Sequence, residues 1–255
     1  MGSNGYYDLS IETAARVRDV LRHLQPHRLV GGRKLRVGRF YDGGYVMEDQ
    51  FQNVEAAYSL GINDDVSWDM DIARLGVPIF QYDHTIAGPP ESHPLFSWKP
   101  IRIDGHASGE GSATLVSLVE ANGHNSATNM IIKCDIEGSE WPLLQATPNK
   151  TLKQFSQIVI EIHSMDMLLD EGHANNIRRA LMNLTASHYV THVHANNFAP
   201  LMVIGGIPVP NVMELTLLRK DIGTFEVSDE SFPTALDMPC HSREADIFLG
   251  RFSFG

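Results

Sequence analysis

Short apolar runs alternate with amphipathic segments along most of the chain. The apolar runs predict strands of about four to eight residues, and the segments between them repeat their apolar residues with the period of a helix. The expected strands are AAYSLGI, PIFQYDHT, WKPIRIDG, NMIIKCDIE, SQIVIEIHSM, YVTHVHANN and NVMELTLLRK, in chain order. Strands that alternate with helices predict right-handed crossovers and a mostly parallel, doubly wound α/β sheet.

The last two expected strands have no helix between them, because a Pro- and Gly-rich loop joins them. We therefore expect the final strand to run antiparallel, as a hairpin partner at the sheet edge. A helix is expected across DLSIETAARVRDVLRHL, capped by Ser10, and a hairpin in KLRVGRFYDGGYVM. We expect one domain over 1–255, with an N-terminal helical cover over 1–30, a core over 31–220 and a C-terminal tail over 221–255.

The composition narrows the class of partner. The chain has 255 residues and a formal charge of −11, so it has no general attraction for nucleic acid or an anionic membrane. A small-molecule substrate is therefore expected, and both a monomer and a homo-oligomer are compatible with the sequence. No apolar signal-peptide core or membrane-spanning run is present, which predicts a cytoplasmic location. Cys134 and Cys240 form neither a disulfide framework nor a CxxC zinc pair.

Polar residues follow the expected strands at the point where each strand ends. In a doubly wound sheet the ligand lies beyond the carboxyl ends of the strands, so these residues predict a site. The polar ends are Gly61-Ile62-Asn63-Asp64-Asp65, Tyr82-Asp83-His84, Asp104-Gly105-His106, Asp135-Ile136-Glu137-Gly138, Glu161-Ile162-His163 and His194-Ala195-Asn196-Asn197.

The first two of these ends predict the kind of ligand. Gly61 lets a ligand approach the backbone, and Asp83, about twenty positions later, can accept both hydroxyls of a ribose. Asn63, Asp64 and Asp65 stand where a GxGxxG turn would be, and the carboxylates of Asp64 and Asp65 would repel a pyrophosphate. The acidic loop favours a nucleoside with a positive charge, such as S-adenosylmethionine, although Asp65 can equally cap the next helix.

Several motifs resemble those of the FkbM-type methyltransferases and their methyltransferase-like relatives in animals. They are RFYDGGYVM, YSLGINDDVSWD, YDHT, IKCDIEGSEWPLL, VIEIH, HVHANN and PNVMELTLLRK, spread from about Arg36 to Lys220. The resemblance implies a class I, Rossmann-like methyltransferase fold with a seven-stranded sheet whose last strand is antiparallel. It also implies methyl transfer from S-adenosylmethionine, usually to an oxygen of a sugar or natural product. The loop from Gly61 to Asp65 departs from the glycine-richer first loop of many members.

Cofactor contacts are expected at four of the predicted turns and at Asp135. By resemblance, the turn Asp42-Gly43-Gly44 borders the cofactor, while its simpler interpretation is a hairpin turn. By position, Gly105-His106 should flank the adenine. The expected cofactor-binding residues are Asp42, Gly43, Gly44, Gly61, Asn63, Asp83, His84, Gly105, His106 and Asp135.

Catalytic residues are expected at Asp135, His163 and His194, and two mechanisms are open. In the first, His163 or His194 is a general base for an acceptor hydroxyl, oriented by Asp135. In the second, Asp135, Glu161 and His163 bind Mg²⁺ or Mn²⁺, which acidifies the hydroxyl. The expected function is O-methylation of a small hydroxylated acceptor; the alternatives are an N-methyltransferase and a non-catalytic module that binds S-adenosylmethionine.

Glu137 and Glu140 complete the acidic motif DIEGSEW. Acidic residues are favourable near a helix N-terminus, so both are expected to cap the helix that begins at SEW. His192 shares a strand face with His194 and is expected to be structural.

Overall fold

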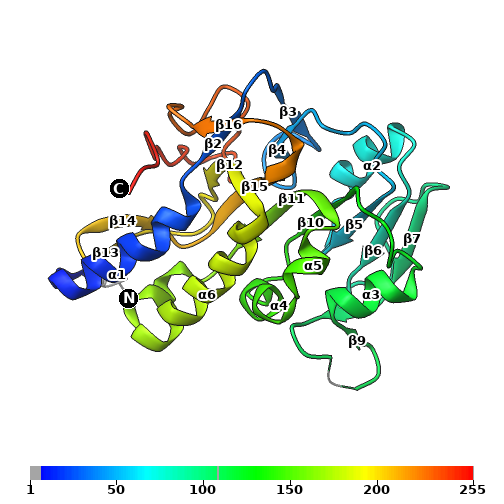
Figure 1. Cartoon of the computed structure of the whole chain (residues 1–255), viewed down its shortest axis with the longest axis horizontal. Helices are drawn as coiled ribbons and strands as arrows, with labels where there is room; N and C mark the ends of the chain where they lie inside the picture. The colour runs from blue at the N-terminus through cyan, green and yellow to red at the C-terminus, as the bar shows by residue number, and fades with distance from the viewer. Residues whose placement is uncertain (1–6, 108, 255) are drawn as a thin grey trace.

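The computed structural model describes residues 7–107 and 109–254. Within this part of the chain, seven strands form one mixed sheet in the order β12-β15-β11-β10-β5-β6-β7 (Figure 1). The expected α/β class is therefore confirmed. The strands are β5 (Ala56–Leu60), β6 (Ile79–Tyr82), β7 (Phe96–Lys99), β10 (Met130–Cys134), β11 (Phe155–Ile162), β12 (His188–Ala195) and β15 (Met213–Arg219).

The order in which successive strands are added to the sheet reverses between β5 and β10. From β5 the sheet extends through β6 to β7, whereas β10 pairs with the opposite edge of β5 and leads on to β11. The pairs β10–β11, β10–β5, β5–β6 and β6–β7 are all parallel. A topological switch point of this kind opens a crevice beyond the carboxyl ends of its two central strands.

The final strand of the sheet, β15, runs antiparallel to both of its neighbours. It lies between β11 and β12, so the expectation that it forms the sheet edge is wrong, and β12 is the edge strand. The hydrogen bonds show this directly: β15 pairs with β11 on one side and with β12 on the other, so both of its edges are used. A hairpin of β13 (Leu201–Ile204) and β14 (Ile207–Pro210) occupies the connection from β12 to β15.

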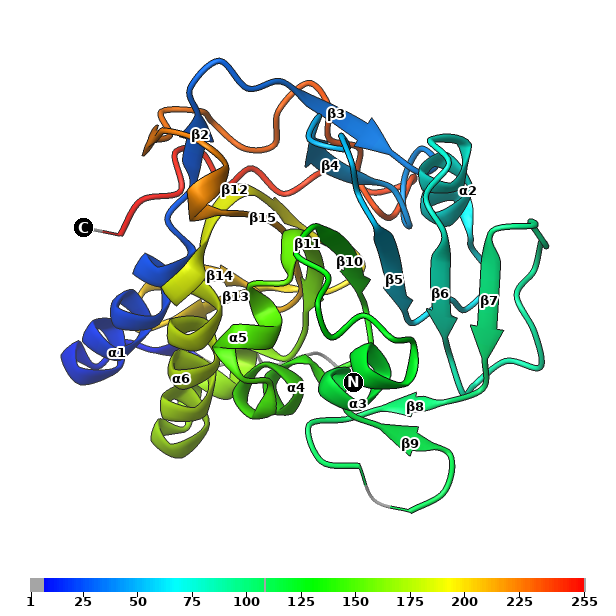
Figure 2. The same cartoon turned by 45° about the vertical axis from the view of Figure 1, so that its right-hand side comes forward.

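Two different layers cover the sheet (Figure 2). One hydrophobic core lies against five helices, and the other lies against α2 (Ser67–Arg74) and the hairpin of β3 (Lys34–Val37) and β4 (Tyr45–Glu48). The five helices are α1 (Ile11–Leu21), α3 (Leu115–Ala121), α4 (Glu140–Ala146), α5 (Asn149–Leu152) and α6 (Glu171–Ser187). The hydroxyl of Ser10 accepts a hydrogen bond from the N–H of Thr13, so the predicted cap of α1 is confirmed.

Strand β10 explains how an apolar run delivers a polar side chain to the site. Successive side chains point to opposite faces of a sheet, and Ile131 and Ile132 accordingly belong to the two different cores. Lys133 follows Ile131 on the face of the β3–β4 hairpin. Because Asp135 comes just after the strand, on the same side, it reaches the crevice rather than a core.

The third expected strand, WKPIRIDG, is only half correct. Strand β7 ends at Lys99, just before Pro100, which has no N–H to donate to a neighbouring strand. Beyond it, β8 (Arg102–Ile103) pairs with β9 (Ser112–Ala113) in a separate small sheet. The true carboxyl end of the third strand is therefore Lys99, not Asp104.

Shorter elements tie the two ends of the chain to the main body. Strand β1 (Tyr7–Asp8) pairs with β13, and β2 (His27–Leu29) pairs with β16 (Phe225–Val227). The 3₁₀ helices are η1 (Arg22–Leu24), η2 (Met165–Leu169) and η3 (Lys220–Ile222). In the tail, Phe232 and Phe252 are buried in the larger core. Of the described helices, none is long and apolar enough to cross a membrane.

Candidate active site

A cavity of about 860 Å³ opens at the switch point of the sheet. It is lined by residues that follow β5, β6, β10 and β11, together with part of the β3–β4 hairpin. Of the described residues that line it, aspartate and glutamate outnumber lysine and arginine by seven to three. The cavity therefore favours a cationic ligand over a phosphorylated one.

Gly61 directly follows β5 and has a left-handed conformation, with φ at +79°. A Cβ at this position would lie 1.6 Å from the carbonyl oxygen of Asp135. The two strand ends are joined there by a 2.9 Å hydrogen bond from the N–H of Asp135 to the carbonyl of Leu60. The close approach that requires a glycine is therefore between two protein segments, and not between the backbone and a ligand.

Both carboxylate oxygens of Asp83 accept hydrogen bonds, which hold together the segments that follow β5 and β6. Its Oδ2 accepts hydrogen bonds from the N–H groups of Ile62 (2.8 Å) and Asn63 (2.9 Å). Its Oδ1 accepts from the N–H (2.7 Å) and the hydroxyl (2.6 Å) of Thr85. Burial raises the pKa of Asp83, but these hydrogen bonds outweigh burial and lower it overall. The carboxylate lines the cavity as expected, but its hydrogen bonds in this structure hold the loop after β5 in place.

The turn Asp42-Gly43-Gly44 faces the cavity with its first two residues. A Cβ on Gly43 would lie 2.3 Å from Oδ2 of Asp65, and a Cβ on Gly44 would lie 2.0 Å from the carbonyl oxygen of Arg39. Both glycines are thus required by neighbouring protein atoms. Burial raises the pKa of Asp42, and the nearby carboxylate of Glu214 raises it further.

Asp65 serves the start of α2 and also lines the cavity. Its Oδ1 accepts from the N–H of Ser67 at 3.1 Å, and its Oδ2 accepts from the Ser67 hydroxyl at 2.8 Å. The N-cap residue of α2 is Val66, so Asp65 does not occupy the cap position, although it accepts the N–H of the first helical residue.

His163 stands at the centre of a carboxylate cluster. Its Nδ1 lies 3.2 Å from Oε1 of Glu140, which is completely buried. Its Nε2 lies 3.3 Å from Glu161, 3.5 Å from Glu137 and 3.9 Å from Asp135. Burial lowers the pKa of His163, but Glu140 and Glu161 outweigh it and raise the pKa to about 11. The side chain is therefore an imidazolium at neutral pH.

Glu140 differs from the expected helix cap. Its Oε1 accepts the N–H of Ile136 and its Oε2 accepts the N–H of Gly138, both at 2.9 Å. Glu140 thus stabilises the turn before α4 and, in the described part of the chain, does not bond to the N–H groups of the helix itself. It also contacts Nδ1 of His163. Glu137 has φ of +54° and is turned out to solvent.

Asp135 and Glu161 are carboxylates that line the cavity beside His163, and unlike Glu137 they are largely buried. Burial raises the pKa of Asp135 to about 6, against the opposing effect of Lys133. Burial also raises the pKa of Glu161, to about 8. Oδ1 of Asp135 is buried and has no hydrogen-bond partner among the described residues. It is therefore an acceptor that a ligand can use.

The structure brings nine of the expected site residues to one cavity. They are Asp42, Gly43, Gly61, Asn63, Asp83, His84, Asp135, Glu161 and His163. The predicted proximity of Asp135 and His163 is confirmed by their 3.9 Å separation.

Four other expected site residues, Gly44, Gly105, His106 and His194, are not among the described residues that line the cavity. A Cβ on Gly105 would lie 2.3 Å from the carbonyl oxygen of Pro142, so Gly105 allows contact with α4. His106 is displaced with it, because the third strand ends at Lys99. His194 is buried in contact with Glu214 and Asp246.

Residues that were not among the expected catalytic, cofactor-binding or metal-binding residues also face the cavity or support it. Tyr45 and Lys133 line it, and Asn196 donates a 3.0 Å hydrogen bond to Oε1 of Glu161. Glu214 lies opposite Glu161 in the β11–β15 register. A carboxylate inside the apolar run NVMELTLL was the available signal for Glu214, and it required knowledge of the strand order to be useful.

Comparison with protein-family models and with curated proteins finds no match for this chain. The geometry and charge of the cavity, together with the motifs quoted above, therefore carry the functional assignment.

Proposed function

We propose that this protein transfers a methyl group from S-adenosylmethionine to a hydroxyl of a small acceptor, a sugar or a natural product. The observation that carries the proposal is the acidic cavity at the switch point of the sheet, with its seven-to-three excess of carboxylates among the described lining residues. A dinucleotide or nucleoside triphosphate would meet repulsion there. A nucleoside that carries a sulfonium and an ammonium group would meet attraction.

The sheet supports the same proposal. The motif resemblance implies seven strands with the last one antiparallel, and β15 is antiparallel to both of its neighbours. Fold alone does not fix an activity, so the weight lies on the residues of the cavity.

The described residues fit this cofactor at two places. Oδ1 of Asp135 is buried without a partner and can accept a hydrogen bond from an ammonium group. Asn63, Asp83 and His84 line the part of the cavity assigned to the ribose, where Asp83 would share its oxygens with the backbone donors it already holds. When bound, S-adenosylmethionine supplies an electrophilic methyl group to a nucleophile placed in line with the sulfonium.

The acceptor hydroxyl must lose its proton as it is methylated, and Asp135 is the best placed base. A protonated imidazole cannot accept a proton, so the raised pKa of His163 argues against the expectation that it is the base. A carboxylate with a pKa of about 6 is ionised at neutral pH and still basic enough to take a proton in the transition state. His163 then acts as a fixed cation that favours the ionised form of Asp135.

A metal-assisted form of the same reaction is favoured by one observation. One potential ligand atom from each of three residues, Asp135, Glu161 and His163, lies within 4.8 Å of the other two, which is close enough for the three to bind one cation. Mg²⁺ or Mn²⁺ held there would acidify the acceptor hydroxyl, and His163 would have to bind it in its neutral form.

The proposal is tested by methyl transfer from isotopically labelled S-adenosylmethionine to a panel of hydroxylated sugars and natural products. Asp135→Asn is expected to lower kcat by about 10²-fold or more, and to weaken cofactor binding only as far as Oδ1 contacts the ammonium group. Labelling of amines but not hydroxyls would indicate an N-methyltransferase, and cofactor binding without turnover would indicate a binding module. Full activity in the Asp135→Asn variant would overturn the assignment of the base.

The metal form has its own test. The enzyme is treated with a chelator, and Mg²⁺, Mn²⁺ or Zn²⁺ is then added back separately. Activity that is lost on chelation and restored by Mg²⁺ or Mn²⁺, but not by Zn²⁺, indicates the metal mechanism. Activity that persists through chelation indicates Asp135 acting as a simple base.

A further inference from the structure

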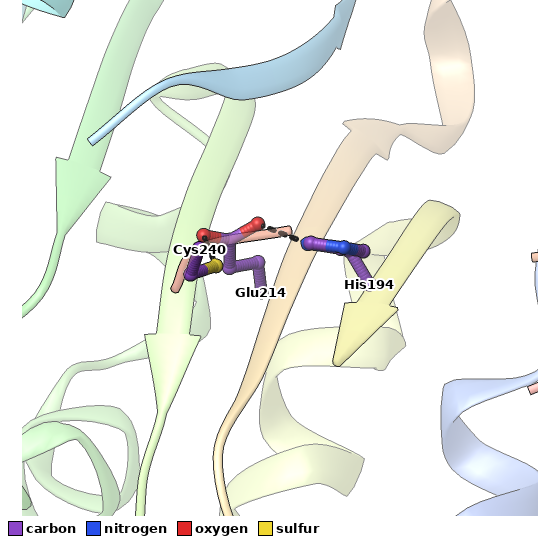
Figure 3. Close-up of side chains that lie close together, drawn as sticks. All are labelled: His194, Glu214 and Cys240. Carbon is purple, nitrogen blue, oxygen red and sulfur yellow. Dashed lines mark hydrogen bonds and ion pairs between the residues drawn. The ribbon is translucent and has the colours of Figure 1, made fainter. Parts of the chain in front are cut away.

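A second cluster of polar side chains lies outside the described lining of the cavity, where the C-terminal tail crosses the sheet (Figure 3). His194 comes from the end of β12, Glu214 from β15, and Cys240 from the tail. All three are buried, with exposures of 1%, 6% and 3%. One ligand atom from each lies within 4.8 Å of the others.

The carboxylate of Glu214 lies between the other two side chains, as Figure 3 shows. Its Oε2 is 2.7 Å from Nδ1 of His194, and its Oε1 is 3.3 Å from Sγ of Cys240. The three donors therefore converge on one small buried volume rather than pairing with separate partners.

Asp246 fixes the histidine from the other side. Its two carboxylate oxygens lie 3.1 and 3.2 Å from Nε2 of His194. A carboxylate that accepts the Nε2 proton leaves Nδ1 as the nitrogen with a free lone pair, and Nδ1 is the atom that faces Glu214. This is the arrangement that orients a histidine toward a bound metal.

Acidic side chains around the cluster would also be stabilised by a bound cation. Glu214 lies opposite Glu161 in the β11–β15 register, and ligand atoms of Asp42, Glu161 and Glu214 lie within 4.8 Å of one another. Buried carboxylates at such short range repel one another strongly. A single imidazolium at His194 compensates only part of this charge, and it does so while also facing Asp246.

We propose that His194, Glu214 and Cys240 form a Zn²⁺ site. Imidazole, thiolate and carboxylate together are a donor set that suits zinc, whereas Mg²⁺ and Ca²⁺ prefer oxygen alone. Zinc bonds of about 2.0–2.3 Å separate tetrahedral ligand atoms by roughly 3.3–3.8 Å. The separation of Nδ1 and Oε2, now 2.7 Å, would need to open by about half an ångström to admit the ion.

A zinc ion bound here would fix the position of one wall of the cavity. The tail next to Cys240 is already tied to Asn197, whose side chain accepts the N–H of His241 at 2.7 Å. The ring of His241 packs edge-on against Phe198, with ring centroids 4.8 Å apart, and Phe198 lines the cavity. Zinc would thus fasten the tail to β12 and β15 and hold this wall in place. The inference stands independently of methyl transfer.

Cobalt spectroscopy on the full chain tests the site, because Co²⁺ takes the place of zinc and reports thiolate ligation by a near-ultraviolet charge-transfer band. The protein is freed of metal with a chelator and titrated with Co²⁺ and then with Zn²⁺. One equivalent of Co²⁺ is expected to produce the band and the visible transitions of a tetrahedral ion, and Zn²⁺ should abolish both. The active-site triad of Asp135, Glu161 and His163 contains no cysteine and cannot produce the band.

The sequence offers a matched control, since Cys134 is the other of its two cysteines. The band should persist in Cys134→Ala, where Cys240 is the remaining thiol, and disappear in Cys240→Ser. Asp246→Asn is expected to weaken Co²⁺ binding about 10- to 100-fold without removing the band, as a positioning residue should. Near-ultraviolet circular dichroism checks that each variant is folded; if Cys240→Ser is not, the spectrum of Cys134→Ala still decides the question. Absence of the band in both the wild type and Cys134→Ala, or its persistence in folded Cys240→Ser, would overturn the proposal.

Discussion

Replacement of Glu140 by glutamine probes the charged cluster beneath the cavity. The carboxylate of Glu140 is completely buried and accepts the N–H groups of Ile136 and Gly138, both at 2.9 Å, while facing Nδ1 of His163 at 3.2 Å. Glutamine has one oxygen and an NH₂ group in place of two oxygens. At least one of the three donors would then face another donor, and the charge that stabilises the imidazolium would be lost.

The expected cost follows from these contacts. Loss of one charge-assisted hydrogen bond costs about 1.5–3 kcal/mol, and a buried donor without a partner costs about 1–3 kcal/mol more. We therefore expect Glu140→Gln to lower the free energy of unfolding by about 3–5 kcal/mol, as is usual when one partner of a buried ion pair is removed. Glu137→Gln is the matched control. Its side chain approaches the same histidine but is 84% exposed, so we expect a change within about 0.5 kcal/mol.

The effect should also depend on pH. His163 has a pKa raised from its ordinary value to about 11, so its contribution to stability is fully present below pH about 6.5. That contribution is lost as the pH rises toward the folded-state value. The difference between wild type and Glu140→Gln should therefore be larger at pH 6 than at pH 9.

Urea unfolding of the wild type and both variants at pH 6 and pH 9 measures these differences. A loss below about 1 kcal/mol in Glu140→Gln, or a loss no larger than that of Glu137→Gln, would refute the reasoning. So would a difference from wild type that grows with pH.

Three further predictions concern the cavity. The rate of methyl transfer, measured as kcat/KM against pH, should rise with pH through about 6, because Asp135 must be ionised to act as a base; a rise centred near pH 11 would instead indicate His163. Gly61→Ala should lower the free energy of unfolding by more than about 3 kcal/mol, because its Cβ would lie 1.6 Å from a carbonyl oxygen. Gly76→Ala is the control, since its φ of +84° is similar and its Cβ would meet no described atom within 4 Å, so a cost of about 1–2 kcal/mol is expected. Asp83→Asn should be more destabilising at pH 7 than at pH 3 in urea unfolding, because the lowered pKa of Asp83 adds stability above about pH 3.9 that is lost in acid. Equal destabilisation at both pH values would show that its hydrogen bonds do not depend on its charge.

The periodicity of the sequence was sufficient to predict the central elements of the fold. The runs that became β5, β10 and β11 are mostly apolar, because strands in the middle of a sheet are buried on both faces. The strand end at Pro100 was visible in the sequence, but the apolar residues Ile101 and Ile103 after it continued the alternating pattern and concealed the break.

The position of β15 could not be predicted in the same way. A strand buried between two neighbours and a strand paired along one edge can have the same apolar run. The choice depends on whether β15 pairs with β11 as well as with β12, which is a property of the tertiary structure.

The site was predictable where it depends on strand ends and not where it depends on the tail. Asp135 and His163 were expected to meet because parallel neighbouring strands end at the same sheet edge, and they do. His194 was expected in the same place, but Asp246 and Cys240 of the tail cover it. Nothing in the periodicity of the tail indicates where it crosses the sheet.

The glycines illustrate a different limit. Gly61 was expected to make room for a ligand, whereas its missing Cβ makes room for the backbone of Asp135. A sequence shows that a position needs a glycine, but the atom that approaches it is known only from the packing of the neighbouring strand.

Calorimetric titration of the full chain with S-adenosylmethionine tests the central claim most directly, with ATP as a matched ligand that shares the adenosine but carries a triphosphate. The acidic cavity at the switch point predicts saturable binding of one S-adenosylmethionine per chain and no measurable binding of ATP. A folded chain that gives no heat with S-adenosylmethionine, or that binds ATP more tightly, would contradict it.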